Sequence, residues 1–240
     1  MILFDAVTTA LLSPLLLIQA LRVRKFALQL SEASGPHSGT IGDGSPLRLL
    51  IIGDSSAAGV GATTQSQALA GQLTAALSLQ NAVQWTLIAT TGATTASTLA
   101  DLKRHPLPKA DIVLIILGVN DVTHGGSQSS WTRNHATLRS LLREKTGARR
   151  LFIGQIPPLG AFPLLPNPLR YLLGRRAIRF DAALRAALAH EPDTRYAPLP
   201  DMLDIKDMAE DGFHPGPRIY AAWAKELARR IISDGPINQI

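Results

Sequence analysis

The chain contains no cysteine among its 240 residues. Disulfide bonds, thiolate nucleophiles and cysteine-based metal sites are therefore excluded, although this absence does not fix the redox compartment. Aromatic residues make up only 5% of the chain, and no run of Lys and Arg has aromatics interleaved with it. Because a nucleic-acid-binding surface needs stacking platforms as well as basic charge, we expect no nucleic-acid partner.

The net charge of +6 has two interpretations. It can attract an anionic partner such as phospholipid headgroups, or it can belong to an ordinary solvated basic surface. The chain has no internal repeat, and only the span Glu32–Ser45 is rich enough in Gly, Ser and Pro to resemble a linker. A chain of this length can bury one sizeable core, so we expect a globular protein.

A hydrophobic run long enough to span a bilayer is also lacking. Residues 6–21 are mostly apolar but include Pro14 and Gln19, and a basic cluster follows them at 22–25. A secretory signal has its basic residues before the apolar run and a cleavage site after it, and neither is evident. The segment can be a helix packed on the domain, an interfacial anchor or a marginal transmembrane segment. We expect a cytoplasmic protein in which residues 1–25 are a candidate peripheral membrane contact.

From residue 47 onward, apolar runs alternate with amphipathic stretches, which is typical of a parallel sheet covered by helices. Strands are expected at 47–53, 84–89, 111–118, 150–155 and 194–197. Helices are expected at 65–79, 95–103, 130–145, 175–189 and 217–232. This order predicts a three-layer α/β/α doubly wound domain with a mainly five-stranded parallel sheet over residues 46–240, after an N-terminal extension of residues 1–45. Ligands of such sheets bind outside the carboxyl ends of the strands.

A serine follows the first expected strand, in the turn Gly53–Gly59 with the sequence GDSSAAG. Ser55 can be exposed to a substrate there, because its small neighbours let the backbone and the substrate come close. The same turn can instead be a tight loop, or cradle a phosphate at a helix N-terminus. It is not the G-x-S-x-G elbow of the α/β-hydrolases, which the chain lacks.

An acid and a base lie three residues apart in the turn Asp211–Gly216, which reads DGFHPG. A serine nucleophile needs a neutral imidazole to take its proton, and the imidazole needs a carboxylate to fix its tautomer. Asp211 and His214 can meet across this turn, with Gly212 easing the bend. The alternative is a surface turn with an Asp that caps a helix.

Two further turns can supply hydrogen-bond donors at the same edge of the sheet. Asn120 follows the central strand and can aim its side-chain amide into the site. Gly92 follows the second strand and can offer an unobstructed backbone N–H. With the backbone N–H of Ser55, these groups would form an oxyanion hole. Each turn alone is a weak signal, because Asn or Gly after a strand is usually only a turn residue.

Taken together, the four turns resemble the SGNH hydrolases, also called GDSL-like lipases and esterases. That family is defined by four blocks that contribute Ser, Gly, Asn and His in this order. The blocks read GDSSAAG, TGATT, GVND and DGFHPG here, and the similarity covers roughly Leu47–Ile232. One departure is Thr91, which stands where the family often has an Asn before its Gly.

The resemblance implies the flavodoxin-like SGNH fold and a serine carboxylic ester hydrolase that works through an acyl-enzyme. It also implies a small-molecule ester substrate with a small to medium acyl group, and no metal or organic cofactor. The matched residues are Ser55 as nucleophile, His214 as base, Asp211 as its partner, and Ser55, Gly92 and Asn120 as oxyanion donors. We interpret the neighbouring Asp54 and Asp121 as structural, orienting loops by hydrogen bonds.

A proline-rich loop, Ile156–Arg170, follows the fourth strand and emerges at the expected catalytic edge. It contains five prolines among bulky apolar residues, which makes it relatively stiff. We expect Phe162 and Leu165 to line an acyl pocket or face a lipid surface, unless the loop only covers the core.

Other functions remain compatible with these residues. The same site could transfer the acyl group to an alcohol or a sugar, or remove acetyl groups from carbohydrates, although few aromatics are present to stack on sugar rings. A non-catalytic α/β module could use the Gly53–Gly59 turn for a phosphate. That alternative lacks a recognised phosphate-loop pattern and does not explain Asp211, His214 and Asn120.

Overall fold

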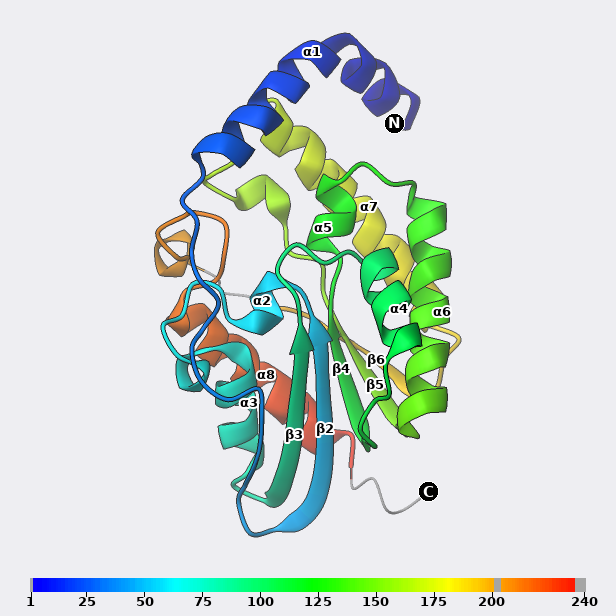
Figure 1. The fold of residues 1–240 in the computed structure, drawn as a ribbon. Helices are drawn as coiled ribbons and strands as arrows, with labels where there is room; N and C mark the ends of the chain where they lie inside the picture. The colour runs from blue at the N-terminus through cyan, green and yellow to red at the C-terminus, as the bar shows by residue number, and fades with distance from the viewer. Residues whose placement is uncertain (1, 201–203, 236–240) are drawn as a thin grey trace.

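The computed structural model describes residues 2–200 and 204–235. A six-stranded sheet lies between two layers of helices, as Figure 1 shows. Across the sheet the strands lie in the order β1 (Ser38–Ile41), β3 (Asn81–Ala89), β2 (Ser45–Gly53), β4 (Ile112–Ile116), β5 (Arg150–Gly154) and β6 (Thr194–Ala197). The predicted three-layer α/β/α class with a mainly parallel sheet is confirmed.

The two faces of the sheet bury separate cores, because successive residues of a strand point to opposite faces. In β2, Leu49 and Ile51 belong to one core and Leu50 and Ile52 to the other, and none is more than 2% exposed. The first core is covered by α3 (Leu69–Leu77) and α8 (Pro217–Ser233). The second is covered by α4 (Thr95–Arg104), α6 (Gln128–Thr146) and α7 (Leu169–Leu188). Burial on both faces explains the near-continuous apolar strands of the sequence.

The chain reverses its direction across the sheet at β2. It runs from β2 to β3 on one side and then to β4 on the other, and both neighbours are parallel to β2. The loops that follow these strands therefore diverge and leave a crevice at the carboxyl edge. The short helices α2 (Ser55–Ala58) and α5 (Val119–Thr123) follow β2 and β4 directly, so Ser55 and Asn120 both lie at this edge.

The sheet has one strand more than the five that the sequence predicts. β1 pairs antiparallel with β3, with Ser38 opposite Thr86, and lies inside the segment predicted as an N-terminal extension. All four residues of β1 are exposed, so the strand has no buried face and leaves no hydrophobic pattern in the sequence. Three short 3₁₀ turns complete the fold: η1 (Gln65–Gln67), η2 (Leu159–Ala161) and η3 (Ile205–Asp207).

Helix α1 (Ile2–Phe26) lies at the end of the molecule where the parallel strands end, beside the start of α7 (Figure 1). The amide of Gln19 ties the two helices together: Nε2 donates to the carbonyl of Asn167 at 2.7 Å, and Oε1 accepts from the N–H of Leu169 at 3.1 Å. Leu16 is only 9% exposed. Within residues 2–200 and 204–235, no helix is long and apolar enough to cross a membrane.

Tyr220 connects α8 to the loop that follows α2, and its replacement tests this connection. Its side chain is fully buried, and Oη donates to the carbonyl of Val60 at 2.6 Å. We expect Tyr220→Phe to lower the free energy of unfolding by about 1–3 kcal/mol, because a buried carbonyl loses its donor. Urea unfolding measures the change, and Tyr171→Phe, at a half-exposed position, is the matched control. Equal stability of the two variants would show that this bond contributes nothing.

Candidate active site

Ser55 is the first residue of α2, and only Asp54 separates it from the end of β2. A Cβ at Gly53 would lie 2.3 Å from the Cβ of Ala57 and 2.8 Å from the carbonyl of Ile116, so only glycine lets α2 turn back this closely. Asp54 caps the helix by accepting a hydrogen bond from the N–H of Ser56 at 3.0 Å. The turn therefore presents Ser55 at the carboxyl edge of the sheet.

Asp211 and His214 meet within one turn, as the sequence predicts. Gly212 has φ +64°, a left-handed conformation that favours glycine and brings the flanking residues together. The carboxylate Oδ1 of Asp211 accepts the N–H groups of Phe213 and His214 at 2.9 and 3.0 Å, and Oδ2 lies 2.5 Å from His214 Nδ1.

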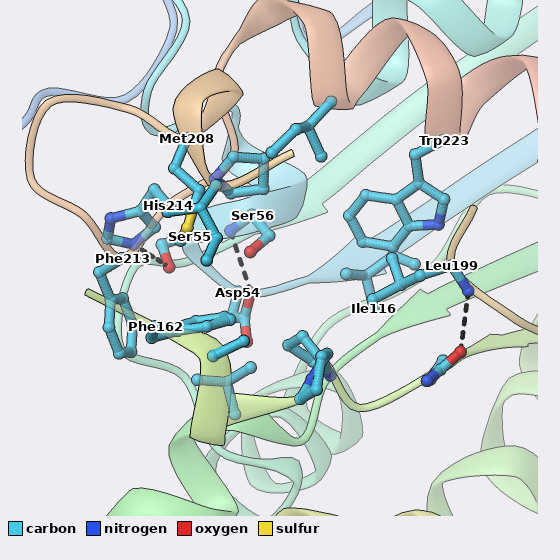
Figure 2. A pocket seen from close by; sticks show the side chains of 18 of the residues that line it. Asp54, Ser55, Ser56, Ile116, Phe162, Leu199, Met208, Phe213, His214 and Trp223 are labelled. Atoms are coloured by element: carbon cyan, nitrogen blue, oxygen red, sulfur yellow. Dashed lines mark hydrogen bonds between the residues drawn. The ribbon is translucent and has the colours of Figure 1, made fainter. Parts of the chain in front are cut away.

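A continuous chain of hydrogen bonds joins the turn of Asp211 and His214 to Ser55. His214 Nε2 lies 2.9 Å from Ser55 Oγ, across 159 positions of sequence (Figure 2). Burial would raise the pKa of Asp211, but the hydrogen bonds from the His214 ring and from two backbone N–H groups outweigh it and hold the pKa below its usual range. Asp211 is therefore a carboxylate that can fix the imidazole tautomer with its free nitrogen toward the serine.

The loop that carries His214 is held from both sides. The N–H of Ala209 donates to the carbonyl of His214 at 2.9 Å, and the N–H of Gly216 donates to the carbonyl of Asp207 at 3.0 Å. Gly61, in the loop after α2, lies so close to this turn that a Cβ there would be 2.3 Å from the carbonyl of Pro215. These contacts keep the imidazole beside α2.

Asn120 links three of the four predicted blocks. Its Nδ2 donates to the carbonyl of Ala93 at 3.0 Å and to Asp54 Oδ2 at 3.3 Å, so it binds the neighbour of Gly92 and the neighbour of Ser55. Gly92 occupies an exposed turn with φ +81°, and apart from its two chain neighbours no described residue has an atom within 4 Å of a Cβ built there. Glycine is thus required at this turn by the backbone conformation and not by crowding.

The carboxyls of Asp54 and Asp121 form hydrogen bonds to neighbouring loops, as the sequence predicts. Asp54 is 2% exposed, and its burial raises its pKa to about 7 against the opposing effect of the Ser56 hydrogen bond. Asp121 accepts hydrogen bonds from the N–H and the hydroxyl of Thr95 at 2.9–3.1 Å. Burial also raises the pKa of Asp121. The two carboxyls orient the turns after β2, β3 and β4 relative to one another.

A mainly apolar cavity opens beside Ser55 and His214 (Figure 2). The cavity has a volume of about 120 Å³, measured as the space open to the centres of water-sized spheres. One water needs roughly 10–15 Å³ on the same measure, so the cavity can hold several waters or a short chain. In Figure 2, Phe162 and Phe213 lie at the His214 end of the cavity, and Trp223 lies at the opposite end. The rings of Phe162 and Phe213 meet edge to face with centroids 5.2 Å apart.

The structure separates the two residues predicted from the proline-rich loop. Phe162 lines the cavity and is partly buried. Leu165 is 4% exposed, packs into the core covered by α4, α6 and α7, and is not among the residues that line this cavity. The expectation of a shared pocket therefore describes Phe162 alone, because Leu165 turns into the core from the same loop.

Sequence reasoning missed the cavity wall that α8 supplies. Ile219 and Trp223 line the cavity, and they lie four residues apart on the apolar face of an amphipathic helix. That spacing was visible in the sequence, but it equally describes helix residues that only fill a core. Among the described residues, no three His, Asp or Glu side chains gather in a way that could hold a metal ion.

Comparisons with known proteins identify the family of this chain. The model of the GDSL-like lipase/acylhydrolase family matches residues 51–222. A curated relative, the GDSL-like esterase Rv1075c of Mycobacterium tuberculosis, is 26% identical in an alignment of 196 residues that covers 75% of this chain. The chain spans only 60% of that relative's length.

Two solved structures share the fold. Est24, a carbohydrate acetylesterase from Sinorhizobium meliloti, superposes with a TM-score of 0.61 at 16% identity, covering 79% of this chain and 100% of Est24. The psychrotrophic esterase EstA from Pseudoalteromonas sp. gives 0.58 at 21% identity, covering 78% and 97%. Since the family model matches most of the sequence, this chain belongs to the GDSL-like lipase/acylhydrolase family.

Proposed function

We propose that the protein is a serine carboxylic ester hydrolase that uses Ser55, His214 and Asp211 as its catalytic triad. The observation that carries the proposal is the unbroken row of hydrogen bonds from Asp211 through the imidazole to Ser55 Oγ. In the first step, Oγ attacks the ester carbonyl and His214 Nε2 takes the hydroxyl proton. His214 then protonates the leaving alcohol, and water hydrolyses the acyl-enzyme by the same route.

The oxyanion of each tetrahedral intermediate needs donors that are already in place. We assign this role to the backbone N–H groups of Ser55 and Gly92 and to Asn120 Nδ2. The amide of Asn120 uses its shorter bond, to the carbonyl of Ala93, as an anchor. Its longer bond, at 3.3 Å to Asp54, is the one that an oxyanion would replace, because it is the weaker of the two.

The cavity is the proposed site of the acyl chain. Its walls are mostly aliphatic and aromatic, and it begins at Ser55 and ends at Trp223, so an acyl chain attached to Oγ can extend into it. Its limited volume suits small to medium acyl groups better than long ones. Carbohydrate deacetylation, the activity in the name of Est24, needs only a small part of this cavity. Transfer to an alcohol uses the same acyl-enzyme and differs only in the acceptor.

Replacement of Ser55 tests the triad. We expect purified Ser55→Ala to lose p-nitrophenyl butyrate hydrolysis by at least about 10⁴-fold in kcat, because the nucleophile is gone while binding remains. Ser56→Ala, which alters the next hydroxyl in the same turn, should keep its turnover and its labelling by a fluorophosphonate. Substantial hydrolysis by folded Ser55→Ala would refute the assignment, and unlabelled wild-type protein would favour a non-catalytic binding module.

The acyl pocket predicts a change in chain-length preference. Trp223→Leu should move the optimum of kcat/KM, measured on p-nitrophenyl esters from acetate to palmitate, toward longer acyl chains, because it opens the far end of the cavity. Phe162→Leu should lower kcat/KM for every ester whose acyl chain extends beyond its first carbons into the cavity. Leu165→Ala is the matched control from the same loop, since it removes core volume without touching the cavity. An identical profile for Phe162→Leu and Leu165→Ala would contradict the pocket.

We also propose that α1 rests on an anionic membrane surface. Its outer side chains are exposed although they are apolar: Leu11 77%, Leu15 43%, Leu17 60%, Ile18 55%, Leu21 56% and Phe26 70%. The exposed cations Arg22, Arg24 and Lys25 follow at its carboxyl end. Large exposed apolar side chains next to basic side chains fit contact with a membrane at the headgroup level. The helix lies at the end of the molecule that carries the active site (Figure 1), so a docked enzyme would present its site toward lipid esters.

Vesicle sedimentation tests this contact. The protein should sediment with vesicles of 70% phosphatidylcholine and 30% phosphatidylglycerol more than with pure phosphatidylcholine, and added salt should release it, since exposed charges are screened. The triple variant Leu17→Ser, Ile18→Ser and Leu21→Ser should stay in the supernatant, while Leu79→Ser, at an exposed position outside α1, should not differ from the wild type. Equal sedimentation of the triple variant would exclude α1. Self-association that this variant abolishes would assign the face to a second copy of the chain.

A further inference from the structure

The segment 27–37, here called the N-terminal strap, is built into the active-site edge of the fold. It leaves α1, passes beside α2 and enters β1 (Figure 1). On one side, the N–H of Ser34 donates to the carbonyl of Thr63 at 3.0 Å, and the N–H of Gln65 donates to the carbonyl of Ser34 at 2.8 Å. On the other side, the carbonyl of His37 accepts from the N–H of Leu87 in β3 at 2.7 Å. Backbone bonds to both neighbours therefore fix the path of the strap.

The strap also contacts α2 at its end. Ala33 is 4% exposed, and its N–H donates to the carbonyl of Ala58 at 3.3 Å. Gln65 Nε2 donates to the carbonyls of both Ala33 and Ala58, at 3.3 and 3.0 Å, and so links the strap to the end of α2. The residue before Ala33 is consequently carried on a backbone that is tied to the helix of the nucleophile.

That residue, Glu32, reaches the turn that contains Gly92. A single carboxylate oxygen, Oε1, accepts both the backbone N–H of Thr91 at 3.2 Å and its hydroxyl at 2.5 Å. The N–H of Ala93 closes the turn by donating to the carbonyl of Thr90 at 3.0 Å, but apart from its two chain neighbours no described residue comes within 4 Å of a Cβ built at Gly92. Packing does not restrain the tip of the turn, so the direction of its peptide groups depends on hydrogen bonds.

We infer that Glu32 is a positioning residue for the oxyanion hole, acting through Thr91 to hold the backbone N–H of Gly92 toward the reacting carbonyl. This inference rests on the proposed function of Ser55 and Gly92. An oxyanion donor stabilises the transition state only if it is oriented before the charge develops, and displacement of such groups by about 1 Å can cost as much as 10²-fold in rate. Because Glu32 binds both the N–H and the hydroxyl of Thr91, it fixes the orientation of Thr91, the residue from which the peptide group carrying the N–H of Gly92 begins.

The exposure of the contact makes its effect separable from stability. Glu32 and Thr91 are both exposed, and hydrogen bonds between exposed groups add little to the free energy of folding. Solvent also screens the negative charge of Glu32 from the oxyanion. Loss of the contact should therefore change the rate of the reaction while leaving the fold in place.

The experiment compares five variants on a soluble p-nitrophenyl ester. Glu32→Ala and Thr91→Val should each lower kcat about 10-fold with little change in KM, because the ground state does not use the oxyanion donors. Glu32→Gln keeps an acceptor oxygen and Thr91→Ser keeps the hydroxyl, so both should recover most of the rate. Glu210→Ala is the charge control, since this exposed acid borders the same surface hollow as Glu32.

A second readout distinguishes positioning from a general structural role. A trifluoromethyl ketone forms a tetrahedral adduct when Ser55 Oγ adds to its carbonyl carbon and His214 takes the proton, which leaves an oxyanion in the hole. Its affinity should fall in Glu32→Ala by the same factor as kcat/KM, with an unchanged Tm. Unchanged kcat in Glu32→Ala, or a loss of activity that follows a lower Tm, would overturn the inference and leave the proposed function intact. Wild-type protein without Ser55-dependent turnover would overturn both.

Discussion

The hydrogen bond between Ser55 Oγ and His214 Nε2 joins two turns that are 159 residues apart, and most of the fold serves to bring them within 2.9 Å. One turn follows the central strand β2, and the other precedes α8, which packs on the face of the sheet below β2. Both turns are short and built around glycines, because a longer or bulkier connection would move one partner away from the other. The position of Ser55 beside His214 therefore depends on the sheet and not on the turns alone.

A second set of contacts, made entirely by polar groups, lies next to the pair of Ser55 and His214. Asp54 binds the N–H of Ser56 and the amide of Asn120, and Asn120 binds the carbonyl of Ala93. Asp121 extends the set to Thr95, whose hydroxyl also accepts from the indole of a buried tryptophan, Trp131. Buried polar groups are costly unless they are paired, and a paired network orients its members strongly. This network aligns the ends of β2, β3 and β4, from which the proposed oxyanion donors come.

The N-terminal segment brings two different contributions to the same edge. Helix α1 keeps large apolar side chains in solvent beside three cations, which suits contact with a lipid surface. The strap that follows is instead held by backbone hydrogen bonds and places Glu32 on the turn of Gly92. The proposed membrane contact of α1 and the proposed positioning residue Glu32 are thus separated by only a few residues of the chain. The cavity between Phe162 and Trp223 lies at the same edge and supplies an apolar path for an acyl chain.

The sequence by itself determined the α/β class, the positions of the five parallel strands and the four turns that converge at their carboxyl ends. These features are local: a strand buried on both faces needs a continuous apolar run, and a tight turn needs glycine at a particular position, as Gly53 and Gly212 show. Asp211 and His214 also meet for a local reason, because they are only three positions apart in the sequence.

Only the tertiary structure decided the features that depend on distant segments. β1 has no buried face, so nothing in its four residues indicates that it pairs with β3. Leu165 and Phe162 are equally apolar, and the path of the loop sends one into the core and the other into the cavity. Trp223 and Glu32 reach the site from opposite ends of the chain, with no motif to mark them. Sequence patterns record what each residue must bury, but which distant surface it meets is settled by packing in three dimensions.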